Sequence, residues 1–282
     1  MKGIDVSKWQ ATIDWKKVRS SGIEFTILRA GLGRLASQKD TYFDQNMRGA
    51  TSNDIPVGVY WYSYATSVSE AVKEAEACLE VIAPYRNDIS LPVFFDQEYE
   101  PNIKALNDKL RTDICLAFME RIEEDGYRTG LYCSYDWYMN WVERSRLSKY
   151  PVWIAQYANK CNYTGSNLIA WQYTSGGKVS GISGNVDMNE GYSGLIIDTT
   201  DGWKQSGSKW KYYKNGSVLK SRWLKDGDYW YYLGSDGSMQ TGWISIKNKT
   251  YYLNEKRVSV NGVTIPSGAC LITDSSGALL SK

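Results

Sequence analysis

Short apolar runs and longer segments with a helical period alternate along the first 190 residues of the chain. Eight of the apolar runs have the length and the β-branched and aromatic content that are typical of strands. They are residues 3–7, 24–30, 57–64, 91–95, 129–134, 152–157, 168–173 and 185–188. Each run is short enough to be one strand of a single sheet or barrel.

Two of the intervening segments, residues 69–82 and 107–124, place apolar residues every three or four positions, which predicts amphipathic helices. Ser67 and Glu70 have the spacing of a capping box before the first helix, and Pro84 follows its end. Strands that alternate with helices predict parallel pairing.

The last two gaps between strands differ from the earlier ones. Residues 158–167 and 174–184 are short and rich in Gly, Ser and Asn, which leaves too little room for crossover helices. We therefore expect the final strands to pair as hairpins. Together these patterns predict an α/β fold, an irregular (β/α) barrel of eight strands with a partly antiparallel closure.

After Gly194 the pattern changes to an aromatic repeat of 20 residues. Trp203, Trp223 and Trp243 open successive units, and each unit carries a pair of adjacent tyrosines. A unit of this length holds one hairpin and cannot bury a core alone, so neighbouring units must stack. The sequence therefore predicts two domains, residues 1–195 and residues 201–282. The second is a small all-β solenoid of hairpins, which residues 258–282 close as an end cap.

The charges of the two parts differ in sign. Residues 1–200 carry 21 basic and 25 acidic residues, a net of −4, whereas residues 201–282 carry 12 and 6, a net of +6. A basic, aromatic-rich second domain is typical of a protein that binds an anionic polymer, although ordinary surface variation is the alternative. The whole chain has a net charge of +2, which gives no indication of a nucleic-acid partner.

The chain contains no histidine, which excludes histidine-based triads, imidazole general bases and histidine-containing zinc sites. Its five cysteines are scattered and lack the spacing of metal ligands, so we expect them to be unpaired. We expect neither a metal nor a cofactor. Acid–base chemistry must therefore fall to carboxylates, tyrosines or lysines.

Two carboxylates at the end of the fourth strand are the leading candidates. Asp96 and Glu98 lie two residues apart, so both side chains point to one face with Cα atoms about 6.6 Å apart. Such a pair either forms salt bridges at a strand end or performs acid–base chemistry, since paired carboxylates shift each other's pKa. Asp5 and Asp187 lie near the ends of the first and eighth strands, so we expect all four acids at one mouth of the barrel.

Three segments keep a recognisable order and spacing over residues 1 to about 192: Asp5-Val-Ser-Lys-Trp-Gln10, Asp96-x-Glu98, and Trp171-Gln-Tyr with Gly184-Asn-Val-Asp187. Together they resemble family 25 glycoside hydrolases, the lysozymes common among phage endolysins. The resemblance implies a barrel enzyme that hydrolyses the β-1,4 bond between N-acetylmuramic acid and N-acetylglucosamine in bacterial peptidoglycan.

The same resemblance implies a role for each acid. Glu98 is the general acid that protonates the leaving oxygen. Asp96 stabilises charge at the anomeric centre or orients the N-acetyl group of the substrate. Asp5 and Asp187 tune this pair and hold the sugar. Retaining, inverting and acetamido-assisted mechanisms all stay open.

Four further residues are candidates for binding the substrate. Tyr62 and Tyr132 are expected to face the cleft and Trp171 to stack on a sugar ring, while Gln156 is a candidate hydrogen-bond partner. Packing in the barrel core is the alternative for the aromatic residues, because alternation along a strand sends about half of them inward.

The second domain resembles the choline-binding repeats of cell-wall proteins. Aromatic cages suit a quaternary ammonium because ring faces are electronegative. The expected wall-binding residues are Trp203, Trp210, Trp223, Trp230, Tyr232, Trp243 and Tyr252. We expect Trp203 and Trp210 to form one cage with an aromatic of the next repeat, and Trp223, Trp230 and Tyr252 to form a second.

The repeats also depart from that pattern. Arg222 replaces the usual glycine and Thr250 replaces a tryptophan. A cationic side chain beside a cage for cations weakens the prediction of choline, so another anionic cell-wall glycopolymer is the alternative ligand. In a further alternative, the tryptophans only hold the hairpins together.

The N-terminus enters a strand at once, without an apolar signal region, and no later segment is long and apolar enough to span a membrane. We therefore expect synthesis in a host cytoplasm, no insertion into the membrane, and action on the wall after release by a holin or by lysis. The alternative functions are a non-catalytic wall-binding protein and another N-acetylhexosaminidase.

Overall fold

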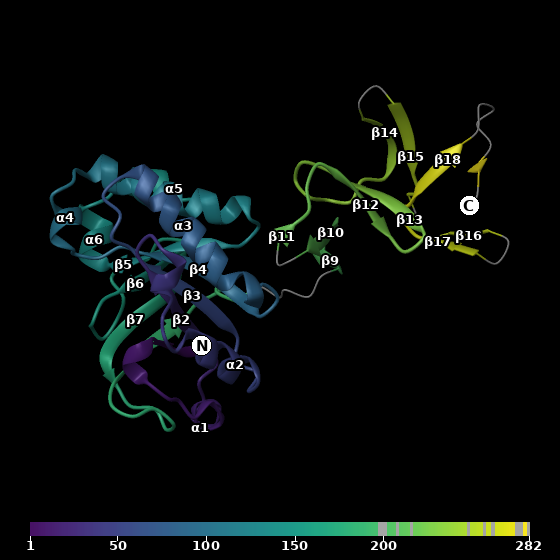
Figure 1. The fold of residues 1–282 in the computed structure, drawn as a ribbon. Helices are drawn as coiled ribbons and strands as arrows, with labels where there is room; N and C mark the ends of the chain where they lie inside the picture. The colour runs from purple at the N-terminus through teal and green to yellow at the C-terminus, as the bar shows by residue number, and fades with distance from the viewer. Residues whose placement is uncertain are drawn as a thin grey trace. The chain divides into compact units, whose positions relative to one another are not determined.

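Eight strands of the computed structural model close into a barrel in which each strand pairs with its neighbours in the sequence (Figure 1). They are β1 (Lys2–Val6), β2 (Phe25–Leu32), β3 (Val57–Tyr62), β4 (Ile89–Asp96), β5 (Thr129–Ser134), β6 (Val152–Ala155), β7 (Leu168–Gly177) and β8 (Val186–Gly191). The pairs from β1 to β7 are parallel, whereas β8 is antiparallel to both β7 and β1. This confirms the predicted barrel with its partly antiparallel closure.

The prediction that the final strands all pair as hairpins is wrong for β6 and β7. These two strands are parallel, with Ile154 opposite Trp171. Residues 156–167 connect them without a helix. An irregular connection is sufficient because β6 has four residues, and the chain needs to return along only about 13 Å.

The helices of this part of the chain surround the barrel. They are α1 (Trp15–Ser20), α2 (Phe43–Thr51), α3 (Val68–Ile82), α4 (Pro101–Lys104), α5 (Asp108–Glu124), α6 (Tyr135–Asn140) and α7 (Arg144–Leu147). The two predicted helices, α3 and α5, pack side by side (Figure 1). Half of the predicted capping box forms: Ser67 Oγ accepts from the Glu70 N–H at 3.3 Å, whereas the Glu70 carboxylate accepts from the N–H and hydroxyl of Thr66.

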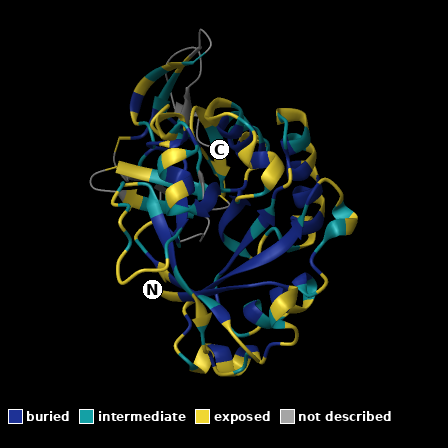
Figure 2. Ribbon diagram, turned by 90° about the vertical axis from the view of Figure 1, so that its left-hand side faces the viewer, coloured by how far each residue is buried: buried dark blue, intermediate teal, exposed yellow. Residues whose placement is uncertain are grey.

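Apolar side chains fill both faces of the barrel strands, which are dark blue in Figure 2. Phe94 points inward and packs on Trp153, with ring centroids 5.3 Å apart. The next residue, Phe95, points outward and packs on Phe118 of α5. Since large apolar residues fill the interior, polar chemistry is confined to the ends of the barrel.

The structure describes residues 1–196, 202–206, 209–214, 217–246, 249–255, 258–260, 263–273 and 279–280. Contacts divide the chain into two compact units, Met1–Ile197 and Asp198–Lys282. Among the described residues, no helix is long and apolar enough to cross a membrane.

Antiparallel hairpins make up the second unit (Figure 1). Its strands are β9 (Gly202–Ser206), β10 (Lys209–Lys214), β11 (Ser217–Val218), β12 (Arg222–Asp226), β13 (Tyr229–Leu233), β14 (Gly242–Ile246), β15 (Lys249–Leu253), β16 (Val258–Val260), β17 (Val263–Ile265), β18 (Cys270–Thr273) and β19 (Leu279–Leu280). The first three hairpins share one register, with Trp203, Trp223 and Trp243 each opposite a tyrosine. The expected end segment joins the third hairpin, because β18 pairs with β15.

Candidate active site

Four acids lie at one mouth of the barrel, as the sequence predicts. Asp96 is the last residue of β4, Glu98 follows it by two, and Asp5 lies near the end of β1. Asp187 is the second residue of β8, and because β8 runs in the opposite direction its start lies at this same mouth. The structure therefore brings together carboxyl groups from three strands.

Asp5 is buried and held by two amides. Its Oδ1 accepts hydrogen bonds from Asn189 Nδ2 at 2.8 Å and from Gln172 Nε2 at 3.0 Å. Burial and the neighbouring Asp187 raise the pKa of Asp5, whereas the hydrogen bonds from the two amides lower it. Asp187 also has a raised pKa through burial, and a hydrogen bond joins it to Asp5. The two acids therefore hold one shared proton more readily than two negative charges.

Asp96 lies beneath the mouth with 2% of its surface exposed. Its Oδ1 has no hydrogen-bond partner among the described residues. Burial, followed by Glu98 and Asp5, raises the pKa of Asp96 well above its usual range, and Arg29 partly opposes this. A buried carboxyl in this state is a hydrogen-bond donor rather than a charge, which suits a group that orients a polar substituent of the substrate.

Glu98 is partly exposed, as is Asp187, whereas Asp5 and Asp96 are buried. Glu98 lines a cleft of about 320 Å³ together with Tyr99, Tyr132, Ser134, Ala155 and Tyr157. Burial raises the pKa of Glu98, and Glu100 and Asp187 raise it further. A carboxylic acid with a raised pKa at the wall of a cleft can donate a proton to a bound oxygen.

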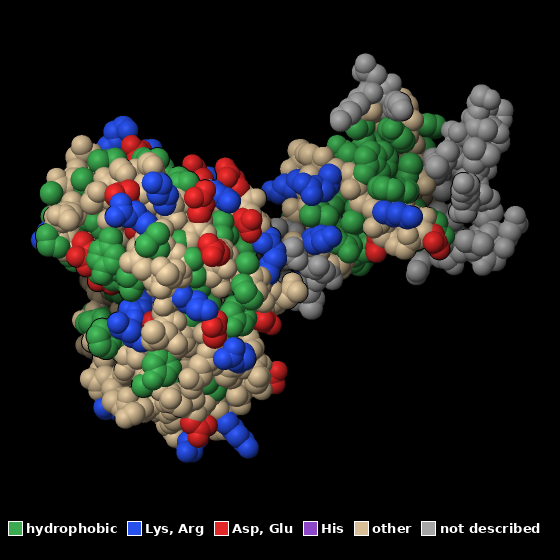
Figure 3. Space-filling view, in the orientation of Figure 1, with side chains coloured by type: hydrophobic (Ala, Val, Ile, Leu, Met, Phe, Trp, Pro, Cys, Tyr) green, Lys and Arg blue, Asp and Glu red, His purple; other side chains and the backbone are tan. Residues whose placement is uncertain are grey.

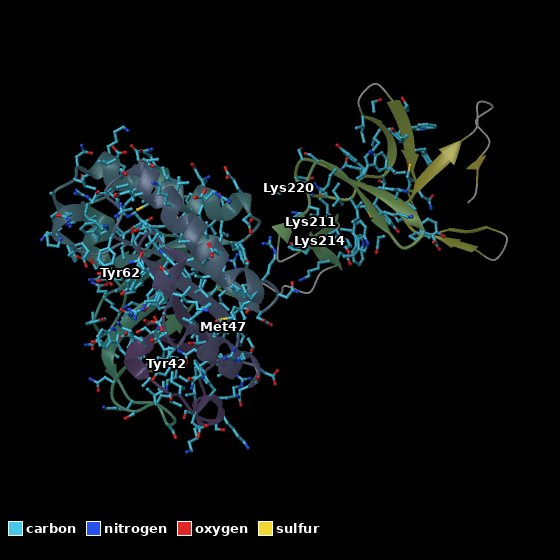
Figure 4. The ribbon with its side chains drawn as sticks, viewed as in Figure 1. Tyr42, Met47, Tyr62, Lys211, Lys214 and Lys220 are labelled. Atoms are coloured by element: carbon cyan, nitrogen blue, oxygen red, sulfur yellow. The ribbon has the colours of Figure 1, made fainter. Side chains whose placement is uncertain are left out.

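The structure places two of the predicted substrate-binding residues at the mouth. Tyr132 lines the cleft, and its hydroxyl donates to Gln172 Oε1 at 3.0 Å. Tyr62, labelled in Figure 4, ends β3 directly beside Asp96. Its hydroxyl donates to Glu100 Oε1 at 2.7 Å, so this phenol is already bonded to a carboxylate.

The other two predicted residues lie elsewhere. Trp171 points outward because it precedes the inward-facing Gln172, and its indole N–H donates to the Gln156 carbonyl at 2.7 Å. It lines a separate hollow with Tyr173 and Glu190. The side-chain oxygen of Gln156 accepts from the Asn162 N–H at 2.7 Å, so it holds the connection between β6 and β7.

Sequence reasoning missed two glutamines that support the acids. Gln172 links Asp5 to Tyr132, and strand alternation from Trp171 is the signal that points to it. Gln97, between the two central acids, faces outward, and its Oε1 accepts from Trp137 Nε1 at 3.0 Å and Cys115 Sγ at 3.2 Å. These contacts fix the strand end that carries the acids.

The described residues contain no group of three or more His, Cys, Asp or Glu side chains arranged to hold a metal ion. All five cysteines are free, as the sequence predicts.

A second candidate site lies in the C-terminal unit. A cavity of about 420 Å³ is lined by Trp203, Trp210, Tyr231, Met239, Pro266 and Ser267. The rings of Trp203 and Tyr231 lie 4.7 Å apart at 64°, and Trp203 Nε1 donates to Asp226 Oδ2 at 2.8 Å. The expected pairing of Trp203 and Trp210 with an aromatic of the next hairpin is present, and that aromatic is Tyr231.

The remaining expected cage residues lie differently. Trp223 packs on Tyr251 at 4.8 Å, whereas Tyr252 packs on Trp243 of its own hairpin at 5.0 Å. Tyr232 likewise packs on Trp223 within one hairpin. Between hairpins, Trp203 and Trp223 therefore contact Tyr231 and Tyr251, whereas Tyr232 and Tyr252 pack within their own hairpins.

Three tryptophans of the repeats are exposed: Trp210 at 40%, Trp230 at 47% and Trp243 at 70%. Hydrophobic side chains gather over the hairpins, with Lys and Arg side chains beside them (Figure 3). Lys211 and Lys214 of β10 belong to the first hairpin, and Lys220 follows β11 (Figure 4).

Comparisons with known proteins find a family match in each of the two units. Residues 4–182 match the model of glycosyl hydrolases family 25, and residues 219–257 match that of a choline-binding repeat. The chain is 24% identical over 200 residues to an autolytic lysozyme of Clostridium acetobutylicum, covering 71% of this chain and 58% of that protein. It is 30% identical over 193 residues to the uncharacterized protein YegX of Escherichia coli, covering 66% and 68%.

The solved structure of the modular autolysin LytC from Streptococcus pneumoniae is similar, with a TM-score of 0.61 and 27% identity. The match covers 68% of this chain and 46% of LytC. The chain thus spans between about half and two thirds of the proteins compared. Since the family model covers more than half of the chain and the acids stand at one barrel mouth, the chain belongs to glycosyl hydrolase family 25.

Proposed function

We propose that this protein is an N-acetylmuramidase that hydrolyses the β-1,4 bond between N-acetylmuramic acid and N-acetylglucosamine in bacterial peptidoglycan. The observation that carries the proposal is Glu98, a carboxyl with a raised pKa that lines the cleft above three further acids. Family membership supports the reaction class. Relatives named as lysozymes, and LytC solved with a synthetic peptidoglycan ligand, support the substrate.

In this proposal Glu98 protonates the leaving glycosidic oxygen. Asp96 lies too deep to meet that oxygen and instead donates a hydrogen bond to the N-acetyl group or stabilises the anomeric centre. Asp5 and Asp187 share a proton and limit the negative charge beneath the sugar. Tyr132 and Tyr157 form the aromatic side of the cleft.

For the C-terminal unit we propose choline of a cell-wall polymer as the ligand of the cavity between Trp203, Trp210 and Tyr231. The ring faces, Met239 and the nearby Asp226 carboxylate suit a weakly hydrated cation. An anionic wall glycopolymer is the second candidate, and the lysines of the first hairpin, such as Lys211 and Lys214, favour it. Since the substrate lies in the wall, we propose that the protein acts there after release through a holin or by lysis.

Product analysis on purified peptidoglycan tests the enzymatic proposal. Wild type and Glu98→Gln are compared after borohydride reduction, and the new ends are identified by mass spectrometry. We expect muramitol ends from wild type and a rate about 10²–10⁴-fold lower from the variant, because the glutamine keeps the shape and loses the proton.

Two other results would contradict parts of the proposal. Glucosaminitol ends would keep the hydrolase and change the bond that is cleaved. No new ends from wild type, on walls that the protein still binds, would favour a non-catalytic wall-binding protein.

A further inference from the structure

Glu100 adds a fifth acid to the mouth of the barrel. Its backbone N–H donates to the Glu98 carbonyl at 2.9 Å, which closes a tight turn directly after β4. Its Oε1 accepts the Tyr62 hydroxyl at 2.7 Å. Tyr62 is itself fixed, because it pairs with Asp96 in the β3–β4 ladder. The turn and this hydrogen bond hold Glu100 at the strand end that carries Asp96 and Glu98.

In the bond between Tyr62 and Glu100, the phenol donates and the carboxyl oxygen accepts. Burial and the bond to Glu100 raise the pKa of Tyr62, so the phenol stays protonated and acts as the donor. The hydrogen bond therefore fixes the Glu100 carboxyl on the turn that follows β4.

Titratable groups that interact electrostatically with Glu98 come from several strands: Asp5 of β1, Tyr62 and Tyr64 from β3 and its end, Asp96 of β4, Tyr132 of β5, Tyr157 after β6, and Asp187 of β8. Cys133 of β5 also interacts with Glu98, but it is buried on the outer face of the barrel. Arg29 of β2 acts on Asp96. Asp5 and Asp96 are buried and hold their protons at higher pH than exposed acids. After burial, Glu100 is the largest influence on the pKa of Glu98, ahead of Asp187.

We propose that Glu100, held by Tyr62 on the turn after β4, is a positioning residue for the acid step that sets the electrostatic surroundings of Glu98. The inference rests on the proposed role of Glu98 as the general acid. It assigns Tyr62 to the support of Glu100 rather than to stacking on a sugar ring.

The test is a pH profile of kcat/KM for the release of reducing ends from soluble peptidoglycan fragments. Glu100→Gln removes the charge and keeps the shape, so the alkaline limb is expected to move down by about 0.5–1 pH unit, with about 3–10-fold lower kcat/KM on that side. On the acid side of the profile, the maximal kcat/KM of the variant is expected to equal that of wild type. Glu80→Gln, at an exposed position near the end of α3, is the matched control and is expected to follow wild type.

Tyr62→Phe leaves every charge in place and provides a second test if Glu100→Gln fails to fold. Tyr62→Phe is expected to shift the alkaline limb downward, but by less than Glu100→Gln does. The double variant is expected to show little more shift than Glu100→Gln alone. In parallel, a ¹³C NMR titration of glutamate-labelled protein follows the Glu98 carboxyl, assigned with Glu98→Gln. Its pKa is expected to fall in Glu100→Gln.

The outcomes separate the inference from the proposed function. One outcome overturns the inference alone. In it, activity is lost in Glu98→Gln, but Glu100→Gln moves neither the alkaline limb of the pH profile nor the titration of Glu98. A uniform loss of activity at all pH values without a shift also overturns it, since that is the mark of a structural contact. Wild type that releases no reducing ends overturns the proposed function and the inference together.

Discussion

Asp5 and Asp187 stand directly opposite each other across the antiparallel pair of β1 and β8, and a hydrogen bond joins their carboxyl groups. The reversal of β8 creates this relationship. In a strand parallel to its neighbours, the second residue would lie at the opposite end of the barrel from Asp96. The unusual closure of the barrel is therefore what completes the acidic mouth.

Replacement of Asp187 by asparagine is expected to lower the pKa of Asp5, because the like charge that raises it is removed. At pH 7 the variant should be more stable than wild type by about 1 kcal/mol, and less active because the acid pair is lost. Urea unfolding and the release of reducing ends measure the two effects. A variant that is both less stable and inactive would contradict the shared proton.

Asp96→Asn is expected to stabilise the protein at neutral pH by about 2 kcal/mol and to reduce activity at least about 100-fold. The pKa of Asp96 is higher in the folded state than in the unfolded state. Asp96 therefore destabilises the folded wild type at neutral pH. This destabilisation disappears as the pH falls towards the pKa of an exposed aspartate. The gain of the variant should therefore shrink from pH 7 to about pH 4. Unfolding curves at several pH values measure it, and a gain that does not depend on pH would refute this explanation.

Gln172→Met is expected to lower the free energy of unfolding by about 1–3 kcal/mol, because the buried Tyr132 hydroxyl loses its acceptor and Asp5 loses a donor. Activity should fall with it, since the pKa of Asp5 rises further when one of its amides is removed.

Gln156→Met is the matched comparison for Gln172→Met. The Gln156 side chain bonds the Asn162 backbone outside the cleft, so the effect on activity should be clearly smaller. Thermal unfolding and product release measure both variants. Equal losses of activity would restore Gln156 as a substrate-binding residue.

Trp210→Ala is expected to weaken binding to choline-containing walls by about 10-fold, because Trp210 lines the aromatic cavity. Trp243→Ala should have little effect, since Trp243 lies outside that cavity and is 70% exposed. Sedimentation with walls, with and without free choline as competitor, measures retention. Binding that ignores choline but falls steeply with salt would identify an anionic polymer as the ligand instead.

Much of this protein can be predicted from its sequence because the decisive signals are local. The apolar runs place all eight barrel strands, and the two-residue spacing of Asp96 and Glu98 places both at the end of β4. The 20-residue repeat predicts the hairpins, and in the structure the first three share one register. The absence of histidine directs attention to carboxylates for the chemistry.

Tertiary structure decided what depends on neighbours distant in the sequence. The parallel pairing of β6 and β7, the partner of Tyr62 and the outward direction of Trp171 follow from how the strands meet. The choice of Tyr231 over Tyr232 depends on which face the next hairpin presents. Alternation shows that two residues differ in face, but the closed barrel and the stacked hairpins determine which face is the site.

The protonation of the acids likewise depends on tertiary structure. Asp96 and Glu98 belong to one short segment of sequence, yet one is sealed beneath the mouth and the other lines the cleft. Their pKa values reflect burial and charges from β1, β8 and the turn that carries Glu100. A sequence determines which groups can titrate, whereas the fold sets the solvent and the charges around each one, and these decide which group is the acid.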